Sequence, residues 1–285
     1  MTNEQIKDIL DWIFPKKIKS YFLKMGERLR NYYQNDQKLF KKNVALKDIE
    51  DGHRCFILGT GASTNEQNLK LLSNEVSMAV AGFFTHEQIS IIKPKYYLVN
   101  SIFRLHGKVL EEEKFINWLV AMDNTLDDST IMFMDASDKP QIDKYNLFQK
   151  KKIYWYQMEY YEEGNISKID LQHLEKGASV SELAISIALY LGFEKIYLLG
   201  FDHNWFETGD YFDNKRYNKY FETTKAKIFK KLKLDSLYHM SIHAKIFYKY
   251  KQLQKLKGNI YNANANTNSY LDVFPKVDFH KLFEK

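Results

Sequence analysis

The stretch that decides the fold is Arg54-Cys-Phe-Ile-Leu-Gly-Thr-Gly-Ala-Ser63. Its first half is a continuous apolar run of strand length, and its second half is a turn of small residues. A similar run, Lys195-Ile-Tyr-Leu-Leu-Gly200, is followed by Phe201 and Asp202. Strands that are apolar throughout are typical of a parallel sheet covered on both faces. A glycine-containing turn directly after such a strand is typical of the ligand-binding edge of an α/β protein.

Further short apolar runs recur along the chain and alternate with helical patterns. The segments that predict strands are residues 54–59, 76–80, 95–100, 130–134, 153–156, 195–200 and 259–262. The main helical patterns cover residues 112–122, 179–190 and 239–256. Buried strands that alternate with helices favour an α/β fold. We therefore expect a single Rossmann-like domain with a mostly parallel sheet, preceded by N-terminal amphipathic helices.

The first 42 residues differ from the rest. Apolar residues at 18, 22, 25, 29 and 32 follow helical spacing, and the opposite face is rich in Lys and Arg. We expect residues 1–42 to form a basic amphipathic helical extension that either packs on the domain or lies on an anionic membrane or a partner. Residues 43–285 would form the Rossmann-like, ligand-binding domain. Within this domain, residues 201–238 do not show the alternation of strand and helix patterns, which indicates a lid segment.

Composition excludes several classes of protein. The 285 residues suffice for one to two domains, since a domain has about 150 residues. Hydrophobic residues make up 45% and charged residues 27%, which excludes a disordered chain and a collagen-like fibre. The single cysteine, Cys55, excludes an internal disulfide and a multi-cysteine zinc site. A net charge of +6 suits an anionic ligand or membrane surface and does not require nucleic acid.

The sequence also indicates a compartment. The first apolar stretch, residues 9–14, is short and is interrupted by Asp11, so no signal peptide is expected. No run approaches 18 apolar residues, so no membrane span is expected either. These features predict a cytoplasmic protein, with peripheral attachment to the inner face of the membrane if the basic extension binds lipid.

The turn after the first strand is one candidate site. Gly59, Thr60, Gly61 and Ser63 let the backbone turn sharply and approach a ligand, and amides and a hydroxyl there can hold phosphate or ribose. The turn is not a full Gly-x-Gly-x-x-Gly and lacks the Lys-Ser/Thr of a P-loop. The alternative is a plain strand-to-helix turn.

A second candidate site combines a helix start with a strand end. Ser179 and Ser181 place amides and hydroxyls at a helix N-terminus, where anions bind, and Gly192 ends that helix. Asp202 follows the carboxyl end of a strand, where ligands bind in open α/β sheets. The alternative is that Asp202 caps a turn.

Other residues are weaker candidates. His203 could act as a base or contact a ligand, or could be an ordinary loop histidine. Asn262 and Asn264 lie in a polar tract after the last strand and could read a base or ribose, or form a solvated turn. No Asp-x-Asp occurs, so no metal site is predicted. Cys55 is expected to be inert core.

Three blocks, in this order, resemble the bacterial lipooligosaccharide sialyltransferases, and more broadly the motility-accessory-factor and 6-hydroxymethylpterin-diphosphokinase-like proteins. Gly59-Thr-Gly-Ala-Ser63 is similar to a Gly-Asn-Gly-Pro-Ser turn. Ser186-Ile-Ala-Leu-Tyr-Leu-Gly192 and Ile196-Tyr-Leu-Leu-Gly-Phe-Asp202 are similar to the later helix and strand motifs. The resemblance covers residues 53–275, and residues 1–42 lie outside it.

The resemblance implies roles for individual residues. Gly59, Gly61 and Ser63 would face the nucleotide. Asn100 and Tyr211 would contact the donor and its phosphate, with Ser179 or Ser181 over the donor. His239 would be the base ahead of the last helix. Three positions depart from the family pattern: Thr60 replaces the turn asparagine, Ala81 replaces a second donor-binding asparagine, and Asn204 stands in the place of another tyrosine.

The function that the resemblance implies is metal-independent, inverting transfer of a sugar. The donor would be CMP-activated and sialic-acid-like, the acceptor a glycan or glycolipid, and the role assembly of capsule, lipooligosaccharide or another surface polysaccharide. No cofactor is expected, and a homo-oligomer is compatible with the sequence. One alternative is a pterin-diphosphokinase-like phosphoryl transferase, whose Mg²⁺ would need Asp202, Asp210 and Asp213. The other is a non-catalytic nucleotide-binding protein of surface assembly.

Overall fold

The computed structural model describes residues 38–100, 112–159, 166, 168–175, 179–203, 236–257, 259–264 and 269–284. The expected N-terminal helices, up to residue 37, lie outside the described residues. Most of the expected lid lies outside them as well, including Asn204 and Tyr211. Within the described ranges, no helix combines the length and the apolar character needed to cross a bilayer.

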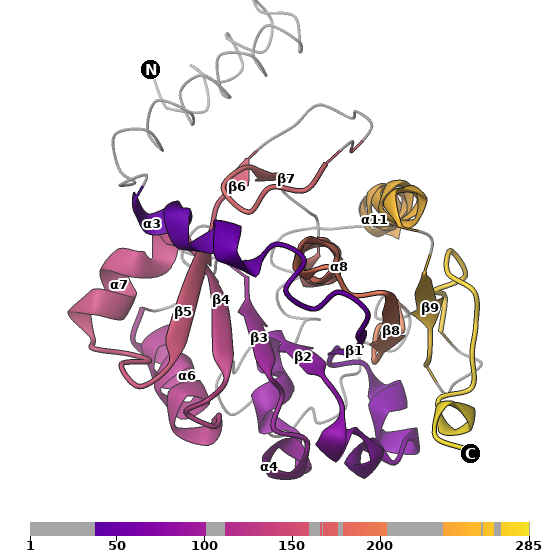
Figure 1. Ribbon diagram of the computed structural model, residues 1–285, viewed down its shortest axis with the longest axis horizontal. Helices are drawn as coiled ribbons and strands as arrows, with labels where there is room; N and C mark the ends of the chain where they lie inside the picture. The colour runs from indigo at the N-terminus through magenta and orange to yellow at the C-terminus, as the bar shows by residue number, and fades with distance from the viewer. Residues whose placement is uncertain are drawn as a thin grey trace, which may run out of the picture.

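The core of the fold is a seven-stranded parallel sheet, as the sequence predicts (Figure 1). Its strands are β1 (Arg54–Leu58), β2 (Ser77–Val80), β3 (Tyr96–Val99), β4 (Ile131–Asp135), β5 (Lys152–Tyr156), β8 (Lys195–Leu199) and β9 (Ile260–Asn262). The spatial order is β5-β4-β3-β2-β1-β8-β9. Strand order therefore reverses between β1 and β8, and this is the topological switch point at which open α/β sheets bind ligands.

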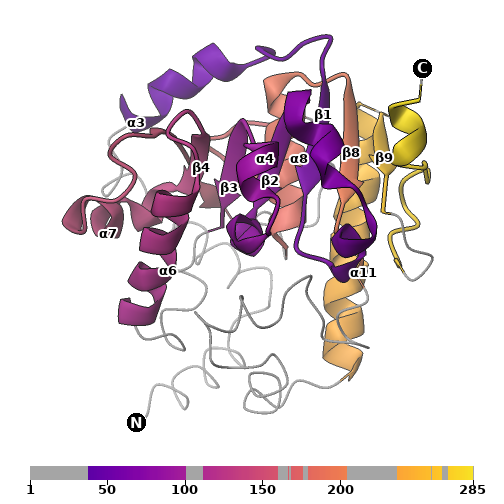
Figure 2. The same ribbon diagram turned by 90° about the horizontal axis from the view of Figure 1, so that it is seen from below.

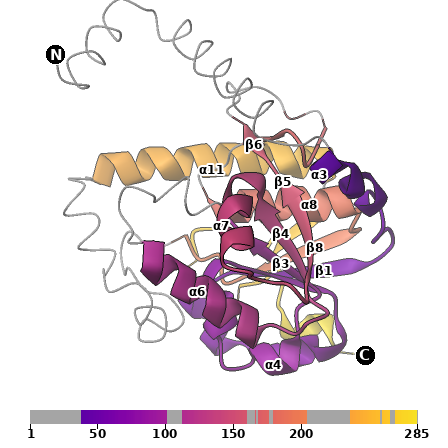
Figure 3. The same cartoon turned by 90° about the vertical axis from the view of Figure 1, so that its left-hand side faces the viewer.

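Helices cover both faces of the sheet, which explains why the strands are apolar throughout (Figure 3). One face carries Phe56 and Leu58 and packs with α4 (Ile89–Ile92) and α6 (Glu112–Thr125). The opposite face carries Cys55 and Ile57 and packs with α8 (Val180–Leu191) and α11 (Ser236–Leu256). Cys55 is fully buried, and this burial raises the pKa of its thiol, so the thiol is the inert core group expected.

Helix α8 is the central helix of its layer and packs against β1, β2 and β3. Ser179 is its N-cap, and the Ser179 amide donates to the Glu182 carboxylate at 2.6 Å, so the helix starts with a capping box. Gly192, at φ +91°, ends it in the left-handed conformation that glycine adopts without strain. The sequence predicts both ends correctly.

Short elements surround the sheet (Figure 2). They are α3 (Lys38–Lys41), η1 (Lys42–Leu46), η2 (Ala62–Glu66), η3 (Leu69–Asn74), η4 (Ala81–Thr85), η5 (Ala136–Asp138), α7 (Lys139–Lys144), η6 (His280–Leu282), and the parallel pair β6 (Met158–Glu159) and β7 (Leu174–Glu175). Phe40 of α3 is buried in the core, and Asn43 donates to the Trp155 carbonyl at 2.7 Å. The packed unit thus includes residues just before position 43.

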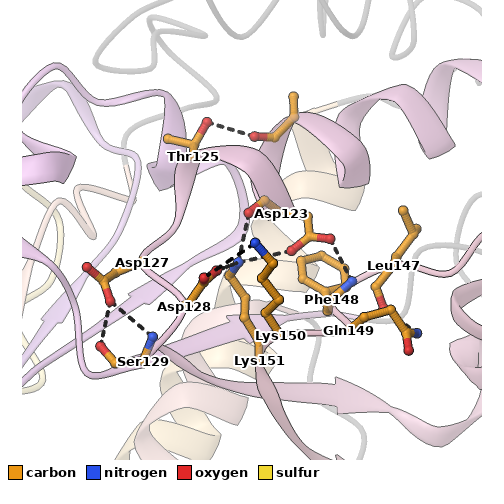
Figure 4. Close-up of polar contacts among 11 residues, drawn as sticks. Asp123, Thr125, Asp127, Asp128, Ser129, Leu147, Phe148, Gln149, Lys150 and Lys151 are labelled. Atoms are coloured by element: carbon orange, nitrogen blue, oxygen red, sulfur yellow. Dashed lines mark hydrogen bonds and ion pairs between the residues drawn. The ribbon is translucent and has the colours of Figure 1, made fainter.

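A buried lysine ties α6 to the start of β5 (Figure 4). Lys151 Nζ lies 2.8 Å from the Asp123 carbonyl oxygen, 3.0 Å from Asp123 Oδ1 and 3.4 Å from Asp128 Oδ1. The other oxygen of Asp123 accepts from the Phe148 amide at 2.7 Å. The ammonium group is therefore paired although the Lys151 side chain is only 1% exposed.

Candidate functional site

The turns after β1 and β8 are in direct backbone contact. The Gly59 amide donates to the Leu199 carbonyl and the Gly61 amide to the Gly200 carbonyl, each at 2.8 Å. A Cβ at position 61 would lie 2.6 Å from the Gly200 oxygen and 2.5 Å from Asp202 Oδ2. Small residues are therefore needed here for two protein segments to meet, and the approach of a ligand to this turn stays a prediction.

Asp202 holds the start of η2. Its carboxylate accepts from the Ser63 amide at 2.9 Å and also from the Ser63 hydroxyl. Both residues are buried. The turn-capping interpretation of Asp202 describes these contacts, and ligand contacts by Asp202 and Ser63 stay predictions.

His203 follows Asp202 in the chain, and its side chain points into the protein interior. Its φ is +56°, and its ring is buried. Three rings of α11 meet it edge-on, with centroid distances of 5.7 Å to His243, 5.4 Å to Phe247 and 5.6 Å to Tyr250. Burial, with a smaller contribution from the neighbouring His243, lowers the pKa of His203 to about 3. Its imidazole is therefore neutral at physiological pH.

A buried chain of polar groups connects His203 to the start of α8. His203 Nε2 lies 3.0 Å from Tyr250 Oη, and Tyr250 donates to Ser181 Oγ. Ser181 Oγ lies 2.8 Å from Ser179 Oγ. Tyr250 is a functional candidate that was not predicted from the sequence, although His243, Phe247 and Tyr250 share one helix face by their spacing of four and three residues.

Asn262 and Asn264 belong to the scaffold at the end of β9. Asn262 donates to the Leu271 carbonyl at 2.5 Å and accepts from the Asn264 amide at 3.0 Å. The Asn264 side chain bonds both the amide and the carbonyl of Phe201, each at 3.3 Å. These contacts brace the β8 turn, and a role for either residue as a reader of base or ribose stays a prediction.

Two neighbouring strand ends complete the edge. Asn100 follows β3, and its Oδ1 is buried without a hydrogen-bond partner among the described residues. Ala81 follows β2 at φ +51°, a conformation that asparagine adopts more readily than alanine. The ends of β1 and β3 are two strand spacings apart, or about 10 Å. Thr60 is half-buried on the turn surface.

The remaining expected residues are placed only in part. Position 239 lies in the first turn of α11, ahead of His243 on the same helix face by its spacing of four residues. Asn204, Tyr211, Asp210 and Asp213 lie outside the described residues. In the part of the chain that the structure describes, no three His, Cys, Asp or Glu side chains come together as metal ligands.

The fold is similar to that of sialyltransferases of known structure. One is the sialyltransferase CST-II in complex with a trisaccharide acceptor and CMP, at 14% identity and a TM-score of 0.43, over 79% of this chain and 85% of that chain. Another is CstII from Campylobacter jejuni with cytidine-5'-monophosphate, at 14% identity and a TM-score of 0.44, over 80% of this chain and 85% of that chain. No family model matches the chain, and no curated protein matches it in sequence. The broader relation to motility-accessory-factor and pterin-diphosphokinase-like proteins stays a prediction.

Proposed function

We propose that this protein is a glycosyltransferase that uses a CMP-activated, sialic-acid-like sugar as its donor. The observation that carries the proposal is that the two glycine-containing strand ends of the sequence resemblance meet at the topological switch point. The Gly61 amide bonds the Gly200 carbonyl there, and Ser63 bonds Asp202. Segments 139 residues apart thus form one edge, in the place where α/β sheets bind nucleotides.

The described residues offer several groups for the donor at this edge. The Asn100 carboxamide has a buried oxygen without a hydrogen-bond partner among the described residues, and Thr60 lies half-buried on the turn. Ser179 is also half-buried at the N-terminus of α8, where the helix dipole favours a negatively charged phosphate. By the resemblance, Tyr211 and Asn204 would complete the phosphate contacts.

Transfer needs a base. The acceptor hydroxyl oxygen would attack the anomeric carbon, the bond from that carbon to the phosphate oxygen would break, and CMP would leave with the electron pair. The acceptor proton would pass to a histidine, with inversion at the anomeric carbon. His203, whose pKa is about 3, is a weak base. A base is most effective when its pKa lies near the working pH, which argues against His203, so we assign this role to His239, the position that the resemblance implies.

The proposed reaction would need no metal and would take place at a membrane surface. A CMP leaving group carries one phosphate, which favours a mechanism without a metal, and the acceptor would be a glycan or glycolipid of capsule, lipooligosaccharide or another surface polysaccharide. The basic residues before position 38 would hold the enzyme at the inner face of the membrane.

Thermal-shift measurements with CMP, CDP, UDP, GDP and ATP, each with and without Mg²⁺, test the nucleotide class. A ligand that binds only the folded state at 100 times its Kd stabilises it by about 2.7 kcal/mol, so a binding nucleotide raises the melting temperature. We expect CMP to do so without Mg²⁺. Stabilisation by ATP with Mg²⁺ alone would favour the phosphoryl transferase, and no response to any nucleotide would contradict both enzyme functions.

A further inference from the structure

The hydroxyl of Tyr250 joins three elements that surround the proposed site. It contacts His203 after β8 and Ser181 in the first turn of α8, and it belongs to α11 itself. We propose that Tyr250 is a positioning residue, which acts through His203 and Ser181 to fix α11 over the carboxyl edge of the sheet. This inference rests on the proposed function, because the face of α11 so fixed is the one that includes position 239.

We assign the hydroxyl proton of Tyr250 to the contact with Ser181, and the other hydrogen-bond directions in this chain follow from that assignment. A tyrosine hydroxyl has one proton, and Tyr250 donates it to Ser181 Oγ. At the other contact, 3.0 Å long, Tyr250 must therefore accept, so Nε2 of His203 carries the ring proton. A neutral imidazole has a single ring proton, which leaves Nδ1 of His203 as an acceptor. The chain thus selects one of the two tautomers.

Tyr250 and position 239, in the first turn of α11, lie on the same face of this helix. Positions 239, 243, 247 and 250 are separated by four, four and three residues, which places them on one side of a helix. His243 and Phe247 both meet the His203 ring edge-on. A shift of α11 that broke the Tyr250 contacts would therefore carry position 239 with it.

The hydroxyl can be removed while the packing of the ring is kept. The Tyr250 ring is fully buried, stacks with Phe247 at 6.1 Å and packs on Phe274 at 5.1 Å. Phenylalanine preserves these contacts and deletes only Oη. A matched control is Tyr190→Phe, which removes the hydroxyl that bonds the Asn43 carbonyl at 3.0 Å near the other end of α8.

The test compares sugar transfer by Tyr250→Phe, Tyr190→Phe and the full-length wild type. We expect Tyr250→Phe to lower kcat at least tenfold with the donor KM within threefold, and Tyr190→Phe to keep kcat even where it lowers the melting temperature equally. A smaller loss of kcat in Tyr250→Phe, or an equal loss in the control, would overturn the positioning role. If Tyr250→Phe does not fold, Ser181→Ala, which removes the acceptor of the tyrosine proton, is judged by the same criteria.

A second readout needs no substrate. Nitrogen-15 NMR of the wild-type histidine rings should show His203, assigned by its loss in His203→Asn, protonated at Nε2 only, and Tyr250→Phe should mix the tautomers. A His203 ring protonated at Nδ1 in the wild type would overturn the proposal. If the wild type transfers no sugar, the proposed function fails and the positioning role fails with it, while the spectrum still shows whether the chain from Tyr250 to His203 forms.

Discussion

Several residues at the junction of β1 and β8 make their structural contacts with residues that are distant in the sequence. Gly59, Gly61 and Asp202 are recognisable in the sequence as unusual, because glycine and aspartate after apolar strands indicate a special turn. Their contacts with one another could not be predicted, since Ser63 and Asp202 are 139 residues apart and only the strand order brings them together. The contact between His203 and Tyr250 likewise depends on the packing of α11 against α8 and the turn after β8.

Replacing Gly61 by alanine should destabilise the fold through steric contact alone. The φ of Gly61 is −68°, which any residue adopts, but an added Cβ would meet the Gly200 oxygen at 2.6 Å. We expect a loss of about 1–3 kcal/mol in the free energy of unfolding, measured with urea. The control is Gly52→Ala, where φ is +78° and no atom lies within 4 Å of the added Cβ, so that only backbone strain is tested. An unchanged stability of Gly61→Ala would contradict the contact.

The buried His203 predicts a pH dependence of stability. The pKa of His203 is lowered in the folded state to about 3, from about 6.5 in the unfolded chain, so the unfolded state binds more protons between these values. Stability contributed by neutral His203 is therefore present above pH 6.5 and is lost as the pH falls towards 3, at up to about 1.4 kcal/mol per pH unit.

The variant His203→Asn isolates this effect. Asparagine tolerates the positive φ, cannot titrate and can still donate to Tyr250. Urea unfolding of the wild type and the variant from pH 7 to 4 should show a steeper loss in the wild type. Parallel curves would show that His203 is accessible to protons in the folded state.

Long helices and strands can be predicted from regular patterns in the sequence, whereas short elements cannot. The strands and the long helices follow their expected ranges within a few residues, because an apolar run or a helical period spans enough positions to be seen. The 3₁₀ helices η1 to η6 and the β6–β7 pair have six residues or fewer, too few to show a period. Their conformation is set by what they pack against.

The contact between α6 and β5 depends on a buried ion pair. Asp123→Ala should leave the Lys151 ammonium buried with a single, longer carboxylate contact at 3.4 Å to Asp128. Removal of one partner of a buried pair costs about 3–5 kcal/mol, and we expect the free energy of unfolding to fall by about 3 kcal/mol. Asp143→Ala, which breaks an exposed pair with Lys139, is the control and should change it by about 0.5 kcal/mol or less. Equal effects of the two variants would contradict the importance of burial.

For the whole molecule, the sequence predicts the parallel sheet and the edge at which open α/β sheets bind ligands. The alternation of apolar runs with helical patterns favours parallel strands, and the carboxyl edge follows from the turn residues, whereas the strand order is known only from the structure. The side-chain constellation is less predictable: Asn262 and Asn264 are polar and near the edge, yet they brace the β8 turn. Only the three-dimensional packing separates such scaffold contacts from groups available to a ligand.

The basic residues before the folded unit predict an effect on membrane binding. Removal of residues 1–37, a boundary chosen because Phe40 is buried, deletes Lys16, Lys17, Lys19, Lys24, Arg28 and Arg30 among others. Each basic residue near an anionic surface contributes about 1 kcal/mol, so the truncated protein should sediment less with anionic liposomes. Neutral liposomes are the control. Equal sedimentation of the two proteins would contradict a membrane role and favour packing on the domain.

Transfer from a CMP-activated sugar is measured as the release of CMP from CMP-activated sialic acid, in EDTA and with a panel of oligosaccharide acceptors. We expect acceptor-dependent release of CMP by the wild type. A general base contributes typically about 10²–10⁴-fold, so His239→Ala should release CMP slower by about that factor while it still binds CMP in calorimetry. A loss of less than about tenfold would move the base away from His239. No acceptor-dependent release of CMP by folded wild-type protein would contradict the claim.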